Sequence, residues 1–174
     1  NTYYNYRFFE EQSSRVNYIL TRLFSTVKRF IAYEVLEKEL YISKSRLLSD
    51  IKVTRDVLLK YKLSLPYKSG RGLSIEGTEV NKRLCIAKEN ININVFNYRD
   101  DCLIQEIKKM MSTIRSIVVE SLAIHHYNIS DDVLQELIVN LTIAVERMYQ
   151  GYYVEEYLEN IMKNINEEMI IAAD

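Results

Sequence analysis

The sequence is poor in the residues that interrupt helices and build turns. Its 174 residues include only 4 Gly and 1 Pro. This scarcity argues against an all-β sandwich, which needs many turn residues, and favours a mainly helical protein. The two cysteines, Cys85 and Cys102, supply neither a disulfide framework nor a zinc signature, so we expect a cytoplasmic protein. No apolar run approaches the roughly 18 residues that span a bilayer, and the first residues lack a signal-peptide pattern.

Residues that carry enzyme chemistry are also scarce. The two histidines, His125 and His126, are adjacent, and neighbouring residues on a helix do not face each other, so a structural or exposed role is favoured over a metal pair. Gly70-Arg-Gly72 lacks the Lys-Ser/Thr of a phosphate-binding loop and precedes a predicted strand. No spacing suggests a catalytic triad. The sequence therefore predicts a protein that is not an enzyme, with no catalytic residues, no metal site and no cofactor.

What the sequence does contain is a marked division of charge. Residues 1–94 carry 17 Lys and Arg against 10 Asp and Glu, whereas residues 95–174 carry 6 against 14, so the net charge of −1 divides into +7 and −8. A basic half joined to an acidic half suggests two domains with different partners. Within residues 43–71, eight basic residues accompany two acidic ones. Charge alone leaves open whether this stretch faces phosphates or only solvent.

Apolar spacing in the basic half predicts three helices. The first begins near Ser13 or Ser14, the second covers Ala32–Leu40, and the third runs from an N-cap at Ser43 to about Tyr61. The apolar residues expected to face inward are Val16, Ile19, Leu20, Leu23 and Phe24 in the first helix, Val35, Leu36 and Leu40 in the second, and Leu47, Leu48, Ile51, Leu58 and Leu59 in the third.

A β-hairpin is predicted directly after these helices. Three of the four glycines and the proline lie in residues 63–77, and apolar residues alternate on both sides of Ser69-Gly70-Arg71-Gly72. A further helix from about Thr78 to Asn90 returns the chain. The order of helix, helix, helix and hairpin is that of a winged helix-turn-helix. We therefore expect residues 1–94 to form a winged helix-turn-helix DNA-binding domain.

The acidic half is predicted to be a helical bundle. The polar stretch Asn90–Asp101 is the best candidate for a domain boundary, and helices are expected over about 103–122, 132–149, 154–164 and from about 167. Ser130 or Asp131 caps the second of these helices and Gly151 ends it. Because the chain begins at Asn1 without Met and ends within a helical pattern, we interpret it as a fragment. The inward residues expected on the second helix are Leu134, Leu137, Ile138, Leu141, Val145 and Met148.

The third helix carries the pattern of a DNA-recognition helix. Its polar side opposes the apolar face, and the N-terminal residues of such a helix contact base edges in the major groove. Arg46 fits a guanine edge, and serines on the same side fit bases or phosphates. Two cations near the hairpin tip are placed to meet the DNA backbone or minor groove. The residues predicted to bind DNA are Lys44, Ser45, Arg46, Ser49, Lys52, Lys68 and Arg71. The alternative is an ordinary solvent-facing helix.

Several motifs resemble the second winged helix of bacterial transcription regulators of the BglG/MtlR/Mga type. Ser14-Arg-Val-Asn-Tyr-Ile-Leu20 is similar to "R-x-x-x-I-L", and the run from Leu40 to Ile51 is similar to "L-x-V-S-R-S-T-I-x-x-D-[IL]". The run Gly70–Arg83 is similar to "G-x-G-[YIL]-x-[IL]-x-G-x-E-x-x-x-R", with Glu79 and Arg83 at i and i+4. The resemblance implies a regulator of sugar-uptake or virulence genes that acts as an activator and as a homodimer on double-stranded DNA.

The acidic half resembles the start of a PTS-regulation domain, the helical module through which phosphotransferase-system proteins control such regulators. Residues 137–147 are similar to "L-x-D-H-[IL]-x-[FI]-A-[IV]-x-R". The resemblance therefore implies that residues 95–174 are the N-terminal part of this domain, with phosphotransferase-system proteins as partners. Asn140 stands where the family usually has a phosphorylatable histidine, and an amide cannot accept that phosphate. Asn140 and Arg147 either keep a regulatory role or are hydrogen-bonding residues that flank the core.

Two other functions remain open from the sequence. The same family contains RNA-binding antiterminators, but their small β-rich RNA-binding module has no counterpart here, so DNA is favoured. A winged helix that has lost DNA binding and serves as a structural or dimerisation module is the other alternative. The second helix of the acidic half is apolar on more than one side, which predicts that it is buried on more than one side. An isologous dimer is expected to cover that surface and to match a two-fold symmetric operator.

Overall fold

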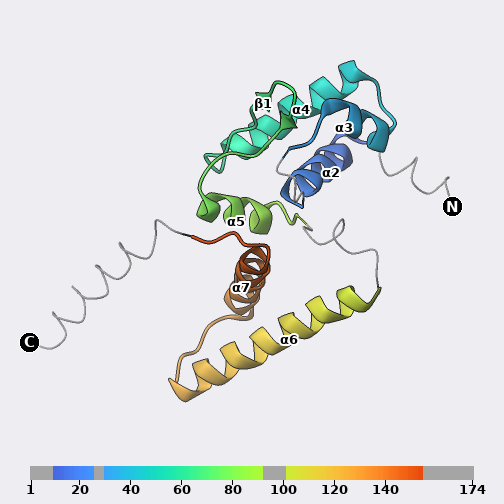
Figure 1. The fold of residues 1–174 in the computed structure, drawn as a ribbon. Coiled ribbons are helices and arrows are strands. Elements are labelled where there is room, and N and C mark those ends of the chain that lie inside the picture. Colours follow the sequence, from blue (N-terminus) through green and yellow to red (C-terminus); the bar gives the residue numbers. More distant parts are fainter. Residues whose placement is uncertain (1–9, 26–29, 92–100, 155–174) are drawn as a thin grey trace, which may run out of the picture.

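The computed structural model describes residues 10–25, 30–91 and 101–154, and in this part the chain is mainly helical (Figure 1). The fold class predicted from the sequence is confirmed: three helices precede a small hairpin, and further helices follow. In chain order the elements are α2 (Gln12–Phe24), α3 (Tyr33–Leu40), α4 (Lys44–Leu59), β1 (Tyr67–Lys68), β2 (Gly72–Leu73), α5 (Glu79–Lys88), α6 (Asp101–Ile124) and α7 (Asp131–Tyr149).

Some expectations fall outside the described residues. The helices predicted over about 154–164 and from about 167 do so almost entirely, as does most of the predicted boundary at 90–101. Within the described ranges, no helix is both long enough and apolar enough to cross a membrane.

The core of the winged helix forms where the apolar spacing predicts it. The five apolar residues expected to face inward from α2 are all buried, and Leu36 and Leu40 of α3 and Leu47, Ile51 and Leu58 of α4 pack against them. Because α2 and α4 lie in contact, these residues close one hydrophobic cluster that also takes in α5 through Cys85 and Ile86.

Three expected core residues lie on the outside. Val35 is 40% exposed, Leu48 45% and Leu59 71%. Each neighbours a fully buried leucine in the sequence, and one step along a helix turns a side chain by about 100°, so these positions lie at the edge of the apolar stripe or beyond it. The predicted apolar face of α4 was therefore too wide.

A buried ion pair joins α2 to α4 inside this core. Arg15 Nε lies 2.6 Å from Asp50 Oδ2, and the two side chains are only 3% and 0% exposed. Gln12 donates a further hydrogen bond to Asp50 Oδ1 at 3.0 Å. Arg15 belongs to the first family-like motif and Asp50 to the second, so these two motifs meet where α2 packs on α4.

The helix caps agree with the sequence at α4 and α7 but not at α2. Ser43 accepts a hydrogen bond from the Arg46 N–H, and Ser130 accepts one from the Val133 N–H, as predicted. α2 instead starts at Gln12 with Glu11 as a cap that makes no side-chain bond, so the prediction of Ser13 or Ser14 was wrong. The earlier start places Gln12 on the helix, where its amide reaches Asp50.

The hairpin is short and depends on one glycine. Tyr67 pairs with Leu73 and Lys68 with Gly72 in antiparallel register, and Ile31 adds an isolated bridge to Leu73. Gly72 has φ +112°, and a Cβ at this position would lie 2.3 Å from the Ile31 carbonyl oxygen. Only glycine therefore allows the segment before α3 to lie against the wing.

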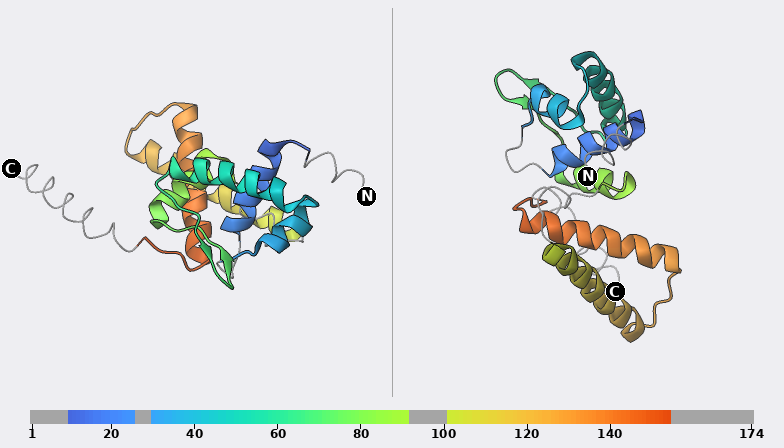
Figure 2. Two further views of the ribbon diagram at one scale, coloured as in Figure 1. Left: turned by 90° about the horizontal axis from the view of Figure 1, so that it is seen from above. Right: turned by 90° about the vertical axis from the view of Figure 1, so that its right-hand side faces the viewer.

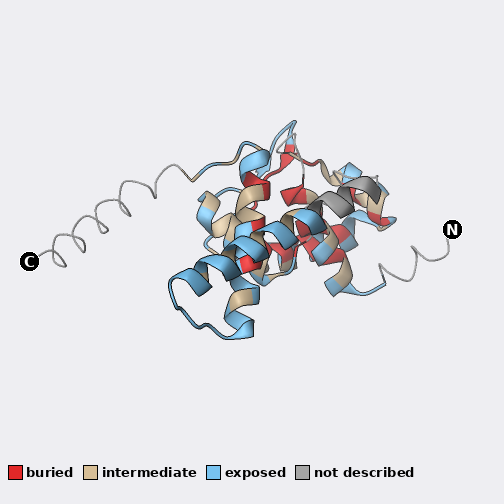
Figure 3. Ribbon diagram, turned by 90° about the horizontal axis from the view of Figure 1, so that it is seen from below, coloured by how far each residue is buried: buried red, intermediate tan, exposed pale blue. Residues whose placement is uncertain are grey.

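The second half is a pair of helices attached to the winged helix. α6 and α7 pack against each other, and α7 also packs on α5, which lies between α7 and the rest of the winged helix (Figures 1 and 2). Ile138 of α7 is buried, and Leu134 and Val145 are partly buried. Leu137, Leu141 and Met148, which were expected to face inward, are 37%, 37% and 40% exposed, and α6 is also largely exposed (Figure 3). Within the described residues, α5 and α6 cover one broad side of α7, and the side with Leu137, Leu141 and Met148 is exposed to solvent.

Candidate nucleic-acid interface

The predicted DNA-binding residues of α4 lie on the surface. Lys44, Ser45, Arg46, Ser49 and Lys52 are all exposed, whereas Leu47, Ile51 and Leu58 turn into the core. The Ser43 cap leaves the first turn of α4 regular, and its early N–H groups point out of the helix end. The structure thus brings the five α4 residues together on the exposed part of one helix; their role in binding DNA remains a prediction.

Two of these five residues also contact the chain at the start of α2. Arg46 Nη2 donates to the Glu10 carbonyl at 3.4 Å, and Gln12 Nε2 donates to Ser49 Oγ at 3.5 Å. Both distances are long, so these bonds hold the side chains weakly. Arg46 and Ser49 therefore lie on the side of α4 nearest to α2, with Ser45 and Lys52 further round the helix.

Leu48 is a candidate contact residue that the sequence reading assigned to the core. It is exposed, and it lies three or four residues from Ser45 and Lys52, which places the three on one surface of α4. An exposed leucine among polar residues on a recognition helix suits the methyl group of thymine. Leu48 directly follows the buried Leu47, and one residue turns a side chain by about 100° around the helix. This offset could have shown from the sequence that Leu48 does not face the core.

The two wing cations are exposed, but neither extends freely from the hairpin. Lys68 Nζ lies 2.8 Å from Glu76 Oε1, so its charge is partly compensated. The Lys68 ammonium and the Arg71 guanidinium lie 5.6 and 5.7 Å from the centre of the Phe30 ring. Cation–π contacts with Phe30 therefore help to position both side chains near the turn of the hairpin. Arg71, which has no carboxylate beside it in the described contacts, is the better placed of the two for a phosphate.

The predicted regulatory residue Arg147 connects the two halves of the chain. Its guanidinium makes two hydrogen bonds to the Glu79 carboxylate, from Nε at 2.8 Å and from Nη2 at 2.7 Å, and the side chain is only 3% exposed. Its plane also lies 3.8 Å from the centre of the Tyr152 ring. Arg83 completes the network, since it bonds Glu79 at 3.1 Å and the Tyr152 carbonyl at 2.9 Å. The residues of two separate family-like motifs thus bind each other.

Asn140, the other predicted regulatory residue, has a different environment. It is exposed, and its amide donates to the Glu136 carbonyl of its own helix at 2.9 Å. Asn140 and Arg147 share one stripe of α7, as their spacing of seven residues predicts. α5 contacts this stripe at Arg147 through Glu79 and at Glu136 through Lys88. Of the two alternatives from the sequence, a hydrogen-bonding residue at the edge of the core fits Arg147. The side chain of Asn140 is exposed and, among the described residues, bonds to its own helix.

Titratable groups near α5 are shifted by burial. Burial raises the pKa of the Cys85 thiol from 9.0 to about 12, and the neighbouring Glu89 adds to this shift. Burial, with a hydrogen bond to Glu89, also raises the pKa of Tyr61 to about 12. Both groups are neutral at physiological pH. In the part of the chain that the structure describes, no group of three or more His, Cys, Asp or Glu side chains is arranged to hold a metal ion.

Comparison with known proteins agrees with this architecture. Residues 5–88 match the Mga helix-turn-helix domain, a range that includes α2 to α5 and the wing. The chain is also 27% identical over 165 residues to a probable licABCH operon regulator of Bacillus subtilis (strain 168). The match covers 92% of this chain but 25% of that protein, so the chain spans about a quarter of the length of this relative. Over residues 5–88 the chain is therefore similar to the Mga helix-turn-helix domain, and over most of its length it is similar to an operon regulator, which supports a DNA-binding transcription regulator.

Proposed function

We propose that residues 1–94 bind double-stranded DNA in the major groove through α4 and contact the backbone through the wing. The observation that carries this proposal is the exposed surface of α4, where Ser45, Leu48, Ser49 and Lys52 lie on a helix whose other side is anchored in the core. Arg46 at its N-terminal end supplies a guanidinium for a guanine edge. Lys44 and Arg71 contact backbone phosphates and so contribute affinity that does not depend on the DNA sequence.

Mobility shifts with genomic fragments at low and moderate salt test this proposal, because phosphate-driven binding weakens steeply with salt. Arg46→Ala is expected to weaken specific binding by about 1–3 kcal/mol, the range for a bidentate base contact. Lys60→Ala, an exposed lysine just beyond α4, is the matched control and should leave discrimination unchanged. If Arg46→Ala discriminates between cognate and scrambled sites as well as the wild type does, base reading by Arg46 is excluded.

The wing is tested separately through the salt dependence. Because Glu76 partly compensates Lys68, Arg71→Ala should lower the slope of log K against log salt by about one phosphate contact, and the double variant with Lys68→Ala by up to about two. Unchanged slopes in both variants would show that the wing does not touch DNA. Complete absence of salt-sensitive binding in the wild type would instead favour the structural or dimerisation module.

We further propose that residues 95–174 are the N-terminal part of a PTS-regulation domain, and that the regulator works as a homodimer. The exposed apolar side chains of α7, Leu137, Leu141 and Met148, support a covering partner, and an isologous dimer matches a two-fold operator. Sedimentation of this chain and of a longer one tests the dimer. Monomers of both at tens of micromolar would refute it, and a dimer of the shorter chain alone would show an artificial contact.

The proposal also includes regulation. The chain would act in the cytoplasm as part of an activator of sugar-uptake or virulence genes, and phosphotransferase-system proteins would control it. The operon regulator among the relatives supports a role in controlling an operon, and the Arg147–Glu79 contact offers a direct connection from α7 to the winged helix. At Asn140 the control does not use phosphate transfer, because an amide is not a phosphate acceptor. Incubation with phosphorylated phosphotransferase proteins should therefore leave residue 140 unmodified, which mass spectrometry can check.

A further inference from the structure

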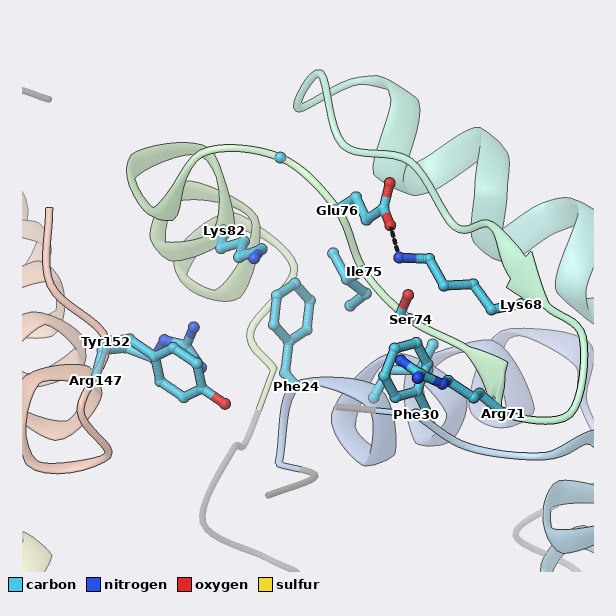
Figure 4. Close-up of a pocket in the computed structure, with 12 residues that line it drawn as sticks. Phe24, Phe30, Lys68, Arg71, Ser74, Ile75, Glu76, Lys82, Arg147 and Tyr152 are labelled. Carbon is cyan, nitrogen blue, oxygen red and sulfur yellow. Dashed lines mark ion pairs between the residues drawn. The ribbon is translucent and has the colours of Figure 1, made fainter. Parts of the chain in front are cut away.

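A cavity of about 540 Å³ lies between the wing and the C-terminal end of α7. Figure 4 shows Arg71, Ser74 and Phe30 on its wing side, Arg147 and Tyr152 on its α7 side, and Phe24 from the end of α2 between them. The cavity is separate from the exposed surface of α4. Its volume lies within the range of about 300–1,000 Å³ found for small-molecule sites.

The charged side chains that line the cavity are mostly positive. They are Lys68, Arg71, Lys82, Arg147 and a single carboxylate, Glu76. Glu79 pairs with Arg147 from outside the lining, and among the described lining residues four cations accompany one carboxylate. These cations come from the wing, α5 and α7, so they approach from different directions. Such an arrangement suits an anion with several oxygens, since Arg and Lys donors bind phosphate well.

A buried hydroxyl in the same lining lacks a partner. Ser74 is only 6% exposed, and among the described residues its Oγ is the buried side-chain polar atom that makes no hydrogen bond. An unsatisfied buried hydroxyl is costly, and in native proteins such a group usually has a partner. An oxygen atom of a bound ligand would supply one. This observation is independent of the charge excess and points to the same cavity.

Aromatic rings form the remaining walls. Phe24, Phe30 and Tyr152 line the space next to the cations, and they provide flat apolar surface for a ring. We propose that this cavity binds a small organic phosphate monoester, with its phosphate held by Ser74 and the surrounding cations and its apolar body against the aromatic rings. Because the wing and α7 both line the cavity, such a ligand would contact both halves of the chain.

Calorimetry with phenyl phosphate in phosphate-free buffer tests this site without DNA, so its result is separate from the proposed DNA binding. Phenyl phosphate should bind at least about tenfold more tightly than inorganic phosphate or phenol. Ser74→Ala and Lys82→Gln should each weaken it by about tenfold or more, as expected for a hydrogen bond to a charged group. Ser69→Ala in the hairpin turn and Lys60→Gln beyond α4 are the matched controls and should bind as the wild type does. Thermal unfolding checks that Ser74→Ala is folded.

Three results would overturn the proposal. Equal affinity for inorganic phosphate and phenyl phosphate would indicate an adventitious ion only. Wild-type affinity in folded Ser74→Ala would place the ligand elsewhere. If a short DNA duplex displaces phenyl phosphate and itself binds Ser74→Ala more weakly, the cavity takes a backbone phosphate of DNA and is not a small-molecule site.

Discussion

The winged helix and the α6–α7 pair bury their apolar residues to very different extents. In the winged helix, α2, α3, α4, the wing and α5 contribute to one cluster of buried side chains that extends from Val16 to Ile91. In the described part of the second half, Ile138 is the fully buried hydrophobic residue, and Ile117, Val119 and Ile124 of α6 are 58%, 45% and 65% exposed. The first region closes its own core, whereas the second relies on its neighbours, and this difference predicts how each responds to substitution.

The largest effect is expected inside the winged helix. Asp50→Ala leaves the buried Arg15 guanidinium without its carboxylate partner, and removing one member of a buried pair costs about 3–5 kcal/mol. Chemical denaturation measures this loss. Glu39→Ala is the control, because the Arg22–Glu39 pair is about a quarter exposed and should contribute about 0–1 kcal/mol. Similar small losses for both variants would contradict the role of the Arg15–Asp50 pair.

Substitutions at two neighbouring residues of α7 compare its buried side with its exposed side. Ile138→Ala removes a side chain that is 2% exposed and should cost about 2–5 kcal/mol. Leu137→Ala, at a position that is 37% exposed, should change the stability of the monomer by less than about 0.5 kcal/mol. Unfolding at micromolar concentrations compares them. A large loss for Leu137→Ala at that concentration would mean that its face of α7 is covered even in the monomer.

The attachment between the two regions is tested at Arg147. Arg147→Ala removes two charged hydrogen bonds to Glu79, each typically worth about 1.5–3 kcal/mol, although Arg83 continues to bind Glu79. Amide hydrogen exchange should rise in α7 and stay unchanged in α4. Lys88→Ala breaks only the half-exposed pair with Glu136 and should have little effect. Faster exchange in both α4 and α7 would show that the regions unfold together and would remove the distinction between them.

The smallest effect concerns the thiol of Cys85. Its raised pKa of about 12 keeps it protonated, and it is fully buried, so in a Cys102→Ser background it should resist thiol reagents at pH 8 until the chain unfolds. In the unfolded chain the thiol ionises near its ordinary pKa of 9.0. Its contribution to stability is therefore present below pH 9 and is lost as the pH rises toward 12. Rapid labelling of the native protein would show that the core around α5 opens readily.

The sequence predicted the winged helix well because its signals are local. Apolar spacing located α2 and α4, the glycine-rich turn located the wing, and Ser43 and Ser130 marked helix starts. Charged residues were harder to place. Arg15 and Asp50, 35 residues apart, and Glu79 and Arg147, 68 apart, pair only through the tertiary fold, so spacing could not reveal them.

The exposed leucines mark a second limit. Leu48, Leu137 and Leu141 satisfy a broad helical stripe, but whether an apolar residue at the edge of a stripe is buried depends on which helix packs beside it. The cavity could not be predicted from the sequence at all, because its lining residues come from α2, the wing, α5 and α7 and meet only in the folded chain. Among its residues the sequence singled out Lys68, Arg71 and Arg147 as functional candidates and Leu23 and Phe24 as core residues, all for other roles.

The segment between the wing and α5 has a consequence for movement within the molecule. Glu76 holds Lys68 of the wing, and Glu79, three residues later, holds Arg147 of α7. Three residues of fully extended chain reach at most about 11 Å. While both ion pairs persist, this short tether limits how far α7 and the wing can separate. Two backbone hydrogen bonds to Ser64 also hold Glu76 in place, so a larger displacement of α7 must first break the Arg147–Glu79 pair.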